Sequence, residues 1–423
     1  MRTVEFPYGK GIITHSFGDE LIAVPESGIN EFDPKASQEE LIRTAMEAPI
    51  GSPKLEELSR GKKSAVIIAS DHTRPVPSKL MIPLMLEKLR AGSPDIDITV
   101  LVATGCHRGT TEAELRAKFG DGIFESERIV VHDCDDEKDL VCIGRLPSGG
   151  ECRINRIALE TELLVSEGFI EPHFFAGFSG GRKSVLPGIG SRSTVLANHC
   201  SEFIDHPDAR TGSLEGNPIH RDMLWAAKTA GLRFILNVVL NKDKRVIHAV
   251  AGDPEAAHKA GTDFLISHCE VKAAPADIVI STNGGYPLDQ NVYQAVKGMT
   301  AAEATVKDGG VIIMLAECGD GVGGDAFYHQ LADEADIEKT MRLFRSRGRT
   351  ETVPDQWQTQ ILLRILKKAR VILISKTDDE TVRRMHMIPA HTLEEALTAA
   401  KALAGKPDPT VTAIPDGVSV IVR

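Results

Sequence analysis

Residues 171–190 are the most informative stretch of this chain, because they contain an imidazole at His173, a glycine-rich turn, and the pair Arg182 and Lys183. Glycines let backbone N–H groups approach an anion closely, and the two cations add charge and donors. The pattern indicates a site for an anionic cofactor. It is not a Walker phosphate-binding loop, because Arg182 stands where that turn needs its second glycine. A solvated surface loop is the alternative for an isolated Gly-Gly-Arg-Lys.

Two histidines, His107 and His173, each follow a strand-like apolar run. An imidazole titrates near neutral pH, so either ring can take up or release a proton during catalysis. Taken singly, each histidine is also compatible with a structural role. Their position in two basic, glycine-bearing loops favours catalysis.

A third loop, after the apolar run at 64–69, contains Asp71, His72, Thr73 and Arg74. Arg74, Thr73 and backbone amides could hold a phosphate, with Asp71 orienting the arginine or a hydroxyl. The alternative is a local turn in which Asp71 and Thr73 cap the chain.

A helix is predicted at residues 289–307, where apolar residues recur at i, i+3, i+4 and i+7 from Val292. Gln294 and Lys297 lie about 60° apart on the opposite, polar face of this helix. An ammonium and an amide suit a substrate carboxylate. A solvent-facing pair is the alternative, and on helix faces it is the more frequent one.

His199, with Cys200 beside it, is a candidate metal ligand, because an imidazole binds zinc, copper or nickel well. Neighbouring side chains diverge on a helix, so at most one of the two should bind an ion. No second ligand follows at His-x-x-x-His spacing. Most of the coordination would therefore have to come from something other than the chain.

The elements that must position these residues follow an α/β pattern. Three apolar, β-branched runs each end in a polar, titratable loop, and they lie at residues 64–69, 96–103 and 163–169. Helices are predicted at 78–90 and after Thr111, which forms a capping box with Glu114. Ligands bind at the carboxyl ends of strands in a mostly parallel sheet, so the three loops should converge.

The second half of the chain repeats this pattern. Strands are predicted at 278–281, 311–316 and 371–375, and a helix at 393–404. At 423 residues the chain is long for one core. We expect two α/β domains with mostly parallel sheets and an active-site cleft between the domains. The predicted domains are 1–272 and 273–409, with a last strand in 410–423 that could return to the N-terminal domain.

Composition excludes several classes of protein. The net charge of -11 argues against nucleic acid as a partner, because phosphates are bound by a basic face. No apolar run is long enough for a membrane span, and the first ten residues do not read as a signal peptide. We expect a cytoplasmic protein that does not bind membranes. The seven cysteines show no Cys-x-x-Cys pair, which favours free thiols in a reducing compartment.

In combination, these motifs resemble those of the nickel-pincer-dependent lactate racemases. The resemblance spans essentially the whole chain. It rests on Asp71-His72-Thr73-Arg74, Thr104-Gly105-Cys106-His107-Arg108, Glu171-Pro172-His173, Gly180-Gly181-Arg182-Lys183, Asn198-His199, Tyr293-Gln294 with Lys297, and Asp355-Gln356-Trp357-Gln358. Several separated motifs in one order are much more specific than any single loop.

The resemblance implies a cofactor, the nickel-pyridinium-3,5-bisthiocarboxylate mononucleotide, attached to Lys183 as a thioamide. It makes His199 the nickel ligand from the protein, with the other ligands supplied by the cofactor. It also places the nucleotide phosphate on the loop formed by Asp71, His72, Thr73 and Arg74.

The resemblance further makes His107 and His173 the acid/base pair, and it assigns Gln294, Lys297 and Tyr293 to substrate binding. One histidine would take the hydroxyl proton of a 2-hydroxy acid while hydride leaves Cα for the cofactor, and both would then return on the other face. The cofactor is needed as an electron sink, because the carboxylate disfavours a second negative charge beside it. Transient contact with cofactor-making enzymes is expected.

Lactate is the first choice of substrate, and malate, a longer aliphatic hydroxy acid or a sugar acid are alternatives. Side chains such as Phe175 and Trp357 could shape the pocket for the substrate's R group. A nicotinamide-dependent dehydrogenase is a rival, but it predicts a Gly-x-Gly-x-x-Gly turn that is not found in a suitable context. A non-catalytic protein that only binds or delivers the nickel cofactor is another rival. It predicts that replacing His107 and His173 leaves function intact.

Overall fold

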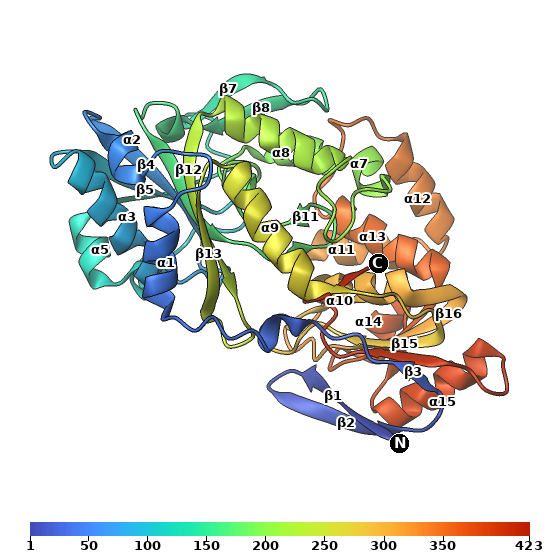
Figure 1. The fold of residues 1–423 in the computed structure, drawn as a ribbon. Helices are drawn as coiled ribbons and strands as arrows, with labels where there is room; N and C mark the ends of the chain where they lie inside the picture. The colour runs from blue at the N-terminus through green and yellow to red at the C-terminus, as the bar shows by residue number, and fades with distance from the viewer. The chain divides into compact units, whose positions relative to one another are not determined.

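The computed structural model describes residues 1–423 and divides them into two compact units. The central unit contains residues 29–199 and 206–265, and the terminal unit contains residues 1–28, 200–205 and 266–423. Each unit is an α/β structure built on a mostly parallel six-stranded sheet (Figure 1), as the sequence predicted.

The sheet of the central unit has the order β13-β12-β9-β4-β5-β6, and only β13 is antiparallel to its neighbour. Its strands are β4 (Ser64–Ser70), β5 (Asp97–Ala103), β6 (Arg128–Val131), β9 (Leu164–Phe169), β12 (Leu232–Leu240) and β13 (Val246–Gly252). The three predicted apolar runs correspond to β4, β5 and β9. Their residues are almost all buried because helices cover both faces of the parallel sheet.

Four of the helices of the central unit begin at a capping side chain, supplied by Ser37, Thr111, Ser191 and Asn217. The helices of this unit are α1 (Gln38–Glu47), α2 (Leu55–Ser59), α3 (Ser78–Gly92), α4 (Glu112–Phe119), α5 (Asp121–Ser126), α6 (Arg192–Asn198), α8 (Pro218–Thr229) and α9 (Ala256–Cys269), and the chain enters the terminal unit within α9. The predicted capping box is confirmed, with Thr111 and Glu114 bonding reciprocally at the start of α4. Short strand pairs, β7 (Leu140–Arg145) with β8 (Glu151–Asn155) and β10 (Pro172–His173) with β11 (Gly177–Phe178), complete the unit.

The terminal unit has a wholly parallel sheet of order β18-β17-β16-β15-β19-β3. Its strands are β3 (Leu21–Ala23), β15 (Ala276–Thr282), β16 (Val306–Leu315), β17 (Arg370–Ile374), β18 (Ile388–Ala390) and β19 (Val411–Ile414). The strands predicted at 278–281, 311–316 and 371–375 are confirmed as β15, β16 and β17. The predicted last strand, in 410–423, is two strands in the structure: β19 joins the main sheet, and β20 (Ile421–Val422) pairs with β14 (Glu270–Val271).

The helices of the terminal unit are α7 (Ser201–Asp205), α10 (Val292–Thr305), α11 (Asp325–Ala332), α12 (Ile337–Ser346), α13 (Gln356–Lys368), α14 (Asp379–Arg384) and α15 (Leu393–Ala404). The helix predicted at 393–404 is confirmed as α15. The helix predicted at 289–307 is shorter at both ends, because Asn291 caps α10 by accepting the Gln294 N–H and Val306 already begins β16. No helix of the structure is both long enough and apolar enough to cross a membrane.

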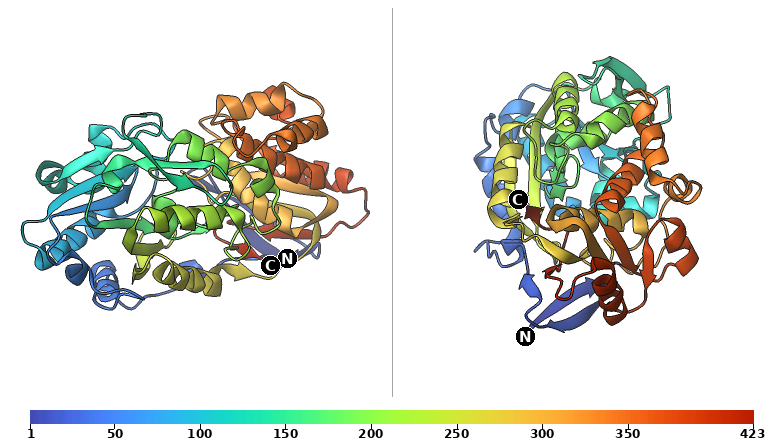
Figure 2. Two further views of the ribbon diagram at one scale, coloured as in Figure 1. Left: turned by 90° about the horizontal axis from the view of Figure 1, so that it is seen from above. Right: turned by 90° about the vertical axis from the view of Figure 1, so that its right-hand side faces the viewer.

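The division into units differs from the predicted domains 1–272 and 273–409 at both ends of the chain. Residues 1–28 belong to the terminal unit because β3 pairs with β19, and residues 410–423 remain there because β19 also pairs with β15. The N-terminal hairpin of β1 (Arg2–Tyr8) and β2 (Gly11–Phe17) shares a hydrophobic core with α15. Figure 2 shows this hairpin in blue beside the dark red helix.

Candidate active site

His107 is oriented by a buried carboxylate. Its Nδ1 lies 2.8 Å from Oδ2 of Asp71, the first residue after β4, and Asp71 is 1% exposed. Burial raises the pKa of Asp71, but the hydrogen bonds from His107 and Thr73 and the charge of Arg74 outweigh it, so the pKa lies below its usual range. Asp71 is thus a carboxylate near neutral pH. His107 must donate from Nδ1, which leaves a lone pair on Nε2 for a substrate proton.

The loop after β4 exposes two of the four residues predicted to bind phosphate. Thr73 and Arg74 are exposed, whereas Asp71 is buried and uses Oδ1 to accept the Thr73 N–H at 3.1 Å and the Thr73 hydroxyl at 2.7 Å. His72 is directed toward the loop after β5, with Nδ1 3.1 Å from the hydroxyl oxygen of Thr110. Exposure leaves the Arg74 side chain available to an anion, whereas Thr73 already donates its N–H and its hydroxyl proton to Asp71, and Asp71 and His72 have positioning contacts within the fold.

The loops after β5 and β9 are joined through the backbone. The Gly105 N–H, two residues before His107, donates to the carbonyl of Gly188, and the Gly188 N–H donates to the carbonyl of Lys183. Two hydrogen bonds therefore connect the segment that carries one predicted acid/base with the segment that carries the predicted tether. The sequence-based prediction that these loops converge is confirmed.

The phenyl ring of Phe175 contacts three of the predicted functional residues. The His173 ring lies edge-on at 4.6 Å between centroids, the His199 ring lies edge-on at 5.0 Å, and the Lys183 ammonium lies 5.8 Å from the ring centre. Phe175 is itself 4% exposed. The predicted base, metal ligand and tether thus surround one rigid aromatic side chain, which is a stronger indication of a common site than their sequence spacing.

His199 has the protonation state that a metal ligand needs. It is 5% exposed and follows directly after α6. Burial and the nearby charge of Lys183 lower the pKa of His199 to about 3, so the imidazole is neutral at physiological pH. Metal ions bind the neutral ring.

His173 differs from His107 in what supports its ring. The Ala176 N–H lies 3.3 Å from Nδ1 of His173, and since a backbone N–H can only donate, Nδ1 is the acceptor. The proton of the neutral ring is then on Nε2. The two histidines have opposite hydrogen-bonding character at Nε2, an acceptor in His107 and a donor in His173.

Arg182 has a different role from the one that the sequence indicated. It is 1% exposed, and its guanidinium donates to the carbonyls of Ala176 and Phe178 at 2.7 Å and to Nδ1 of His220 at 3.0 Å. Burial lowers the pKa of Arg182 to about 9, so it stays charged at neutral pH. Arg182 therefore holds the turn between His173 and Lys183 in place and offers no donor to a surface anion.

The glycines of this turn are also required by packing. Gly180 has φ of +74°, and a Cβ there would lie 2.7 Å from Oδ1 of Asn237. The Gly181 N–H is bonded to that same oxygen at 2.7 Å. Close approach of the backbone to the interior, not to an anion, explains these two glycines.

The predicted substrate residues lie on α10 of the terminal unit. Val292, with the rest of the predicted apolar stripe, is buried, and Gln294 and Lys297 are half-buried on the other face, as predicted. The Tyr293 ring packs edge-on against Phe327 at 5.3 Å, and its hydroxyl bonds to Asp355. Asp355 adopts a left-handed backbone with φ of +63°, a conformation that costs free energy in a non-glycine residue.

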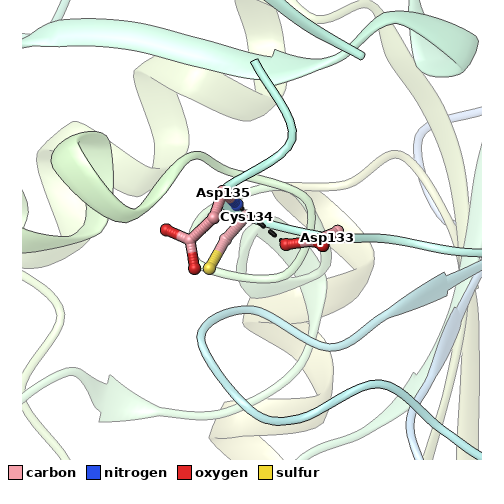
Figure 3. A group of neighbouring side chains, drawn as sticks. All are labelled: Asp133, Cys134 and Asp135. Carbon is pink, nitrogen blue, oxygen red and sulfur yellow. Dashed lines mark hydrogen bonds between the residues drawn. The ribbon is translucent and has the colours of Figure 1, made fainter. Parts of the chain in front are cut away.

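A second group of potential metal ligands, Asp133, Cys134 and Asp135, has its atoms within 4.8 Å of one another (Figure 3). Its carboxylates are already used: Asp133 accepts the Asp135 N–H at 2.9 Å, and Asp135 forms two hydrogen bonds with Arg192 at 2.7 and 2.8 Å. The arginine charge beside it disfavours a cation. All seven cysteines are free thiols, as predicted.

Comparison with known proteins agrees with this set of residues. The family model for the lactate racemase N-terminal domain matches residues 8–212, and that for the lactate racemase C-terminal domain matches residues 271–422. The chain is 52% identical to the lactate racemase of Thermoanaerobacterium thermosaccharolyticum and 53% identical to that of Lactiplantibacillus plantarum, over the full length of both chains in each case. This chain belongs to the lactate racemase family.

Solved structures agree with this membership of the lactate racemase family. The structure of the lactate racemase apoprotein from Thermoanaerobacterium thermosaccharolyticum superposes with a TM-score of 0.96 at 52% identity and covers both chains completely. A Thermotoga maritima protein has a TM-score of 0.66 at 17% identity, with 93% of this chain and all of that chain covered. At that identity the second likeness concerns the fold alone.

The sequence-based description of this lactate racemase family member missed residues that are buried. Phe175 was assigned to the substrate pocket, but it contacts His173, Lys183 and His199. Glu167, within β9, was not considered at all. A signal was present, because a carboxylate inside a strand that is otherwise apolar needs an internal partner.

Proposed function

We propose that this chain racemises lactate, with the nickel-pincer mononucleotide as its cofactor. The observation that carries the proposal is the arrangement around Phe175, where His173, Lys183 and His199 lie on one ring. The full-length relatives named lactate racemase support the choice of lactate.

The residues present fit this cofactor. His199 offers a buried, neutral imidazole, which suits a nickel ion whose other ligands come from the cofactor. Lys183 lies on the same phenyl ring and is the proposed point of thioamide attachment. Arg74, exposed on the loop after β4, would bind the nucleotide phosphate, and Thr73 would join it by turning its hydroxyl proton from Asp71 to the phosphate. When bound, the cofactor supplies an acceptor that can take a hydride from carbon and return it.

The chain's own residues would handle the substrate and its proton. Lys297 and Gln294 would bind the carboxylate of the 2-hydroxy acid through an ammonium and an amide, and Tyr293 would help to form that site. His107, with its lone pair on Nε2, would take the hydroxyl proton as Cα loses its hydride. His173 would be the second acid/base and would serve the other enantiomer once the proton of its neutral ring moves from Nε2 to Nδ1, which breaks the 3.3 Å contact with the Ala176 N–H.

The decisive experiment is coexpression with the cofactor-making enzymes, followed by intact mass, nickel content and a chiral assay of lactate. We expect added mass on Lys183, nickel bound to the protein, and conversion of either enantiomer to the racemate. Added mass that persists in Lys183→Ala would refute the tether. Activity on a sugar acid with none on lactate would refute the substrate. Wild-type protein that carries the added mass and nickel but converts neither enantiomer would favour a protein that only binds the cofactor, and full activity in both His107→Ala and His173→Ala would refute the acid/base roles.

A further inference from the structure

Glu167 is a carboxylate placed inside the central sheet. It lies in β9, a strand whose six residues are all buried, and Glu167 itself is 2% exposed. Burial raises the pKa of this carboxyl, against the opposing effects of Lys118 and of the hydroxyl groups bonded to it. One of its oxygens, Oε2, has no hydrogen-bond partner. A buried carboxyl of this kind costs free energy of folding, so packing alone does not explain it.

The other oxygen, Oε1, accepts three hydrogen bonds. The donors are the Ser70 N–H at 3.0 Å, the Ser70 hydroxyl at 3.1 Å and the Ser78 hydroxyl at 3.0 Å. Ser70 is the last residue of β4 and Ser78 is the first residue of α3. A single oxygen atom therefore joins the two ends of the loop formed by residues 71–77.

The loop also has contacts of its own, since the Arg74 N–H donates to the Asp71 carbonyl at 3.3 Å and Asp71 bonds to Thr73 and His107. Pro75 and Pro77 have no N–H to donate, which removes two backbone hydrogen bonds. Lys118 supports the middle of the loop by donating to the carbonyl of Arg74 at 3.2 Å. The side chains of Thr73 and Arg74 are left at the surface, and Asp71 is left against His107.

We propose that Glu167 is a positioning residue for the reaction. By closing the loop 71–77 it fixes Arg74 and Thr73 for the cofactor phosphate, and it fixes Asp71 as the partner of His107. The phosphate part rests on the proposed function of this loop, whereas the closure of the loop and the Asp71 contact do not.

The first test measures the loop in the full-length protein without cofactor. Ser78→Ala removes one of the three donors, and Ser59→Ala is the matched control, since Ser59 is equally buried and donates to Leu89 on the same helix α3 but not to the loop. A hydrogen bond changes an equilibrium constant by up to about tenfold, and by more where the acceptor is ionised. Amide hydrogen exchange in residues 71–76 should speed up about tenfold in Ser78→Ala and remain unchanged in Ser59→Ala. Equal exchange in the two variants would overturn the proposal.

The second test measures cofactor loading by intact mass, with limiting cofactor in the coexpression. We expect severalfold lower loading in Ser78→Ala than in Ser59→Ala, together with lower kcat/KM per loaded enzyme. Arg74→Ala separates the two hypotheses. If Arg74→Ala loads like wild type, the phosphate role of the loop is wrong whatever Ser78 does. If Arg74→Ala loads poorly while Ser78→Ala matches Ser59→Ala, the role of Glu167 is wrong.

A third variant pair keeps the proposal testable if loss of the carboxyl destabilises the fold. Glu167→Gln retains Oε1 as an acceptor for all three donors, whereas Glu167→Leu retains none. Exchange protection of the loop and cofactor loading should be close to wild type in Glu167→Gln and lost in Glu167→Leu. Equal loss in both variants would overturn the role assigned to Oε1.

Discussion

Asp71→Asn should remove most of the racemase activity by moving a proton on His107. In the wild-type protein, Oδ1 of Asp71 accepts the Thr73 N–H at 3.1 Å, and Oδ2 accepts from Nδ1 of His107 at 2.8 Å. An asparagine must keep its oxygen toward the Thr73 N–H, because that group can only donate. Its NH2 group then faces His107, and Nδ1 becomes an acceptor. The proton of the neutral ring moves to Nε2, which can no longer take a proton from the substrate.

The magnitude follows from two effects on the same step. A carboxylate and an imidazolium about 4 Å apart attract each other by about 4 kcal/mol at an effective dielectric constant of about 20. The His107 side chain is 46% exposed, so solvent screening leaves roughly half of this attraction, or about 30-fold in rate. Loss of a general base costs about 10²–10⁴-fold. The two effects overlap, and we expect kcat/KM to fall by about 10²–10⁴-fold.

The assay is the initial rate of racemisation from each enantiomer, followed by chiral chromatography and divided by the nickel content of each preparation. Enantiomers have equal free energies in water, so kcat/KM must fall by the same factor in both directions. Asp289→Asn is the control, because Asp289 is a fully buried carboxylate that accepts backbone N–H groups of Gly9 and Glu317 and has no histidine partner. A loaded Asp71→Asn enzyme within threefold of wild type would refute the reasoning.

Three further outcomes are expected. Burial and the Arg182 charge lower the pKa of His220 to about 3. Below pH 6.5 the unfolded chain binds a proton at this histidine and the folded protein does not, so the free energy of unfolding falls with pH, by about 1.4 kcal/mol at pH 5.5. Urea unfolding should show a smaller loss in His220→Gln. Gly180→Ala should lower the unfolding free energy by more than about 2 kcal/mol, measured beside Gly149→Ala, where φ is also positive but no atom lies within 4 Å of the new Cβ. Lys297→Gln should raise KM for lactate about tenfold, whereas Lys367→Gln, at an exposed lysine, should leave KM unchanged. Equal KM values in the two variants would contradict carboxylate binding by Lys297.

Much of the fold could be predicted because its strands are buried on both faces. β4, β5 and β9 are unbroken apolar runs that end in polar loops, and both features are local in sequence. β19 was not predicted separately from the last strand in 410–423, because its four residues lie shortly after Pro407 and Pro409 and before Pro415, where the sequence is typical of turns. The assignment of residues 1–28 to the terminal unit depends on β3 pairing with β19, which no local pattern encodes.

The candidate site could be predicted to the extent that its residues are exposed to ligands and form recognisable motifs. The segments with His107 and Lys183 are joined in the structure, and His199 joins Lys183 at Phe175. Arg182 could not be assigned correctly, because an arginine beside glycines has the same sequence pattern whether its guanidinium faces water or backbone carbonyls. Only its burial and its bonds to the carbonyls of Ala176 and Phe178 distinguish the two cases.

Asp71, Glu167 and Arg182 share a property that bears on how this site works. Each has an ionisable side chain no more than 2% exposed, and each bonds to groups next to a predicted functional residue. Burying a charge costs several kcal/mol unless hydrogen bonds compensate it, and those bonds have fixed directions. An apolar residue in the same place would pack without fixing the loop. The buried ionisable groups therefore stabilise one loop geometry over the others. Hydride and proton transfer between fixed groups requires such a single geometry.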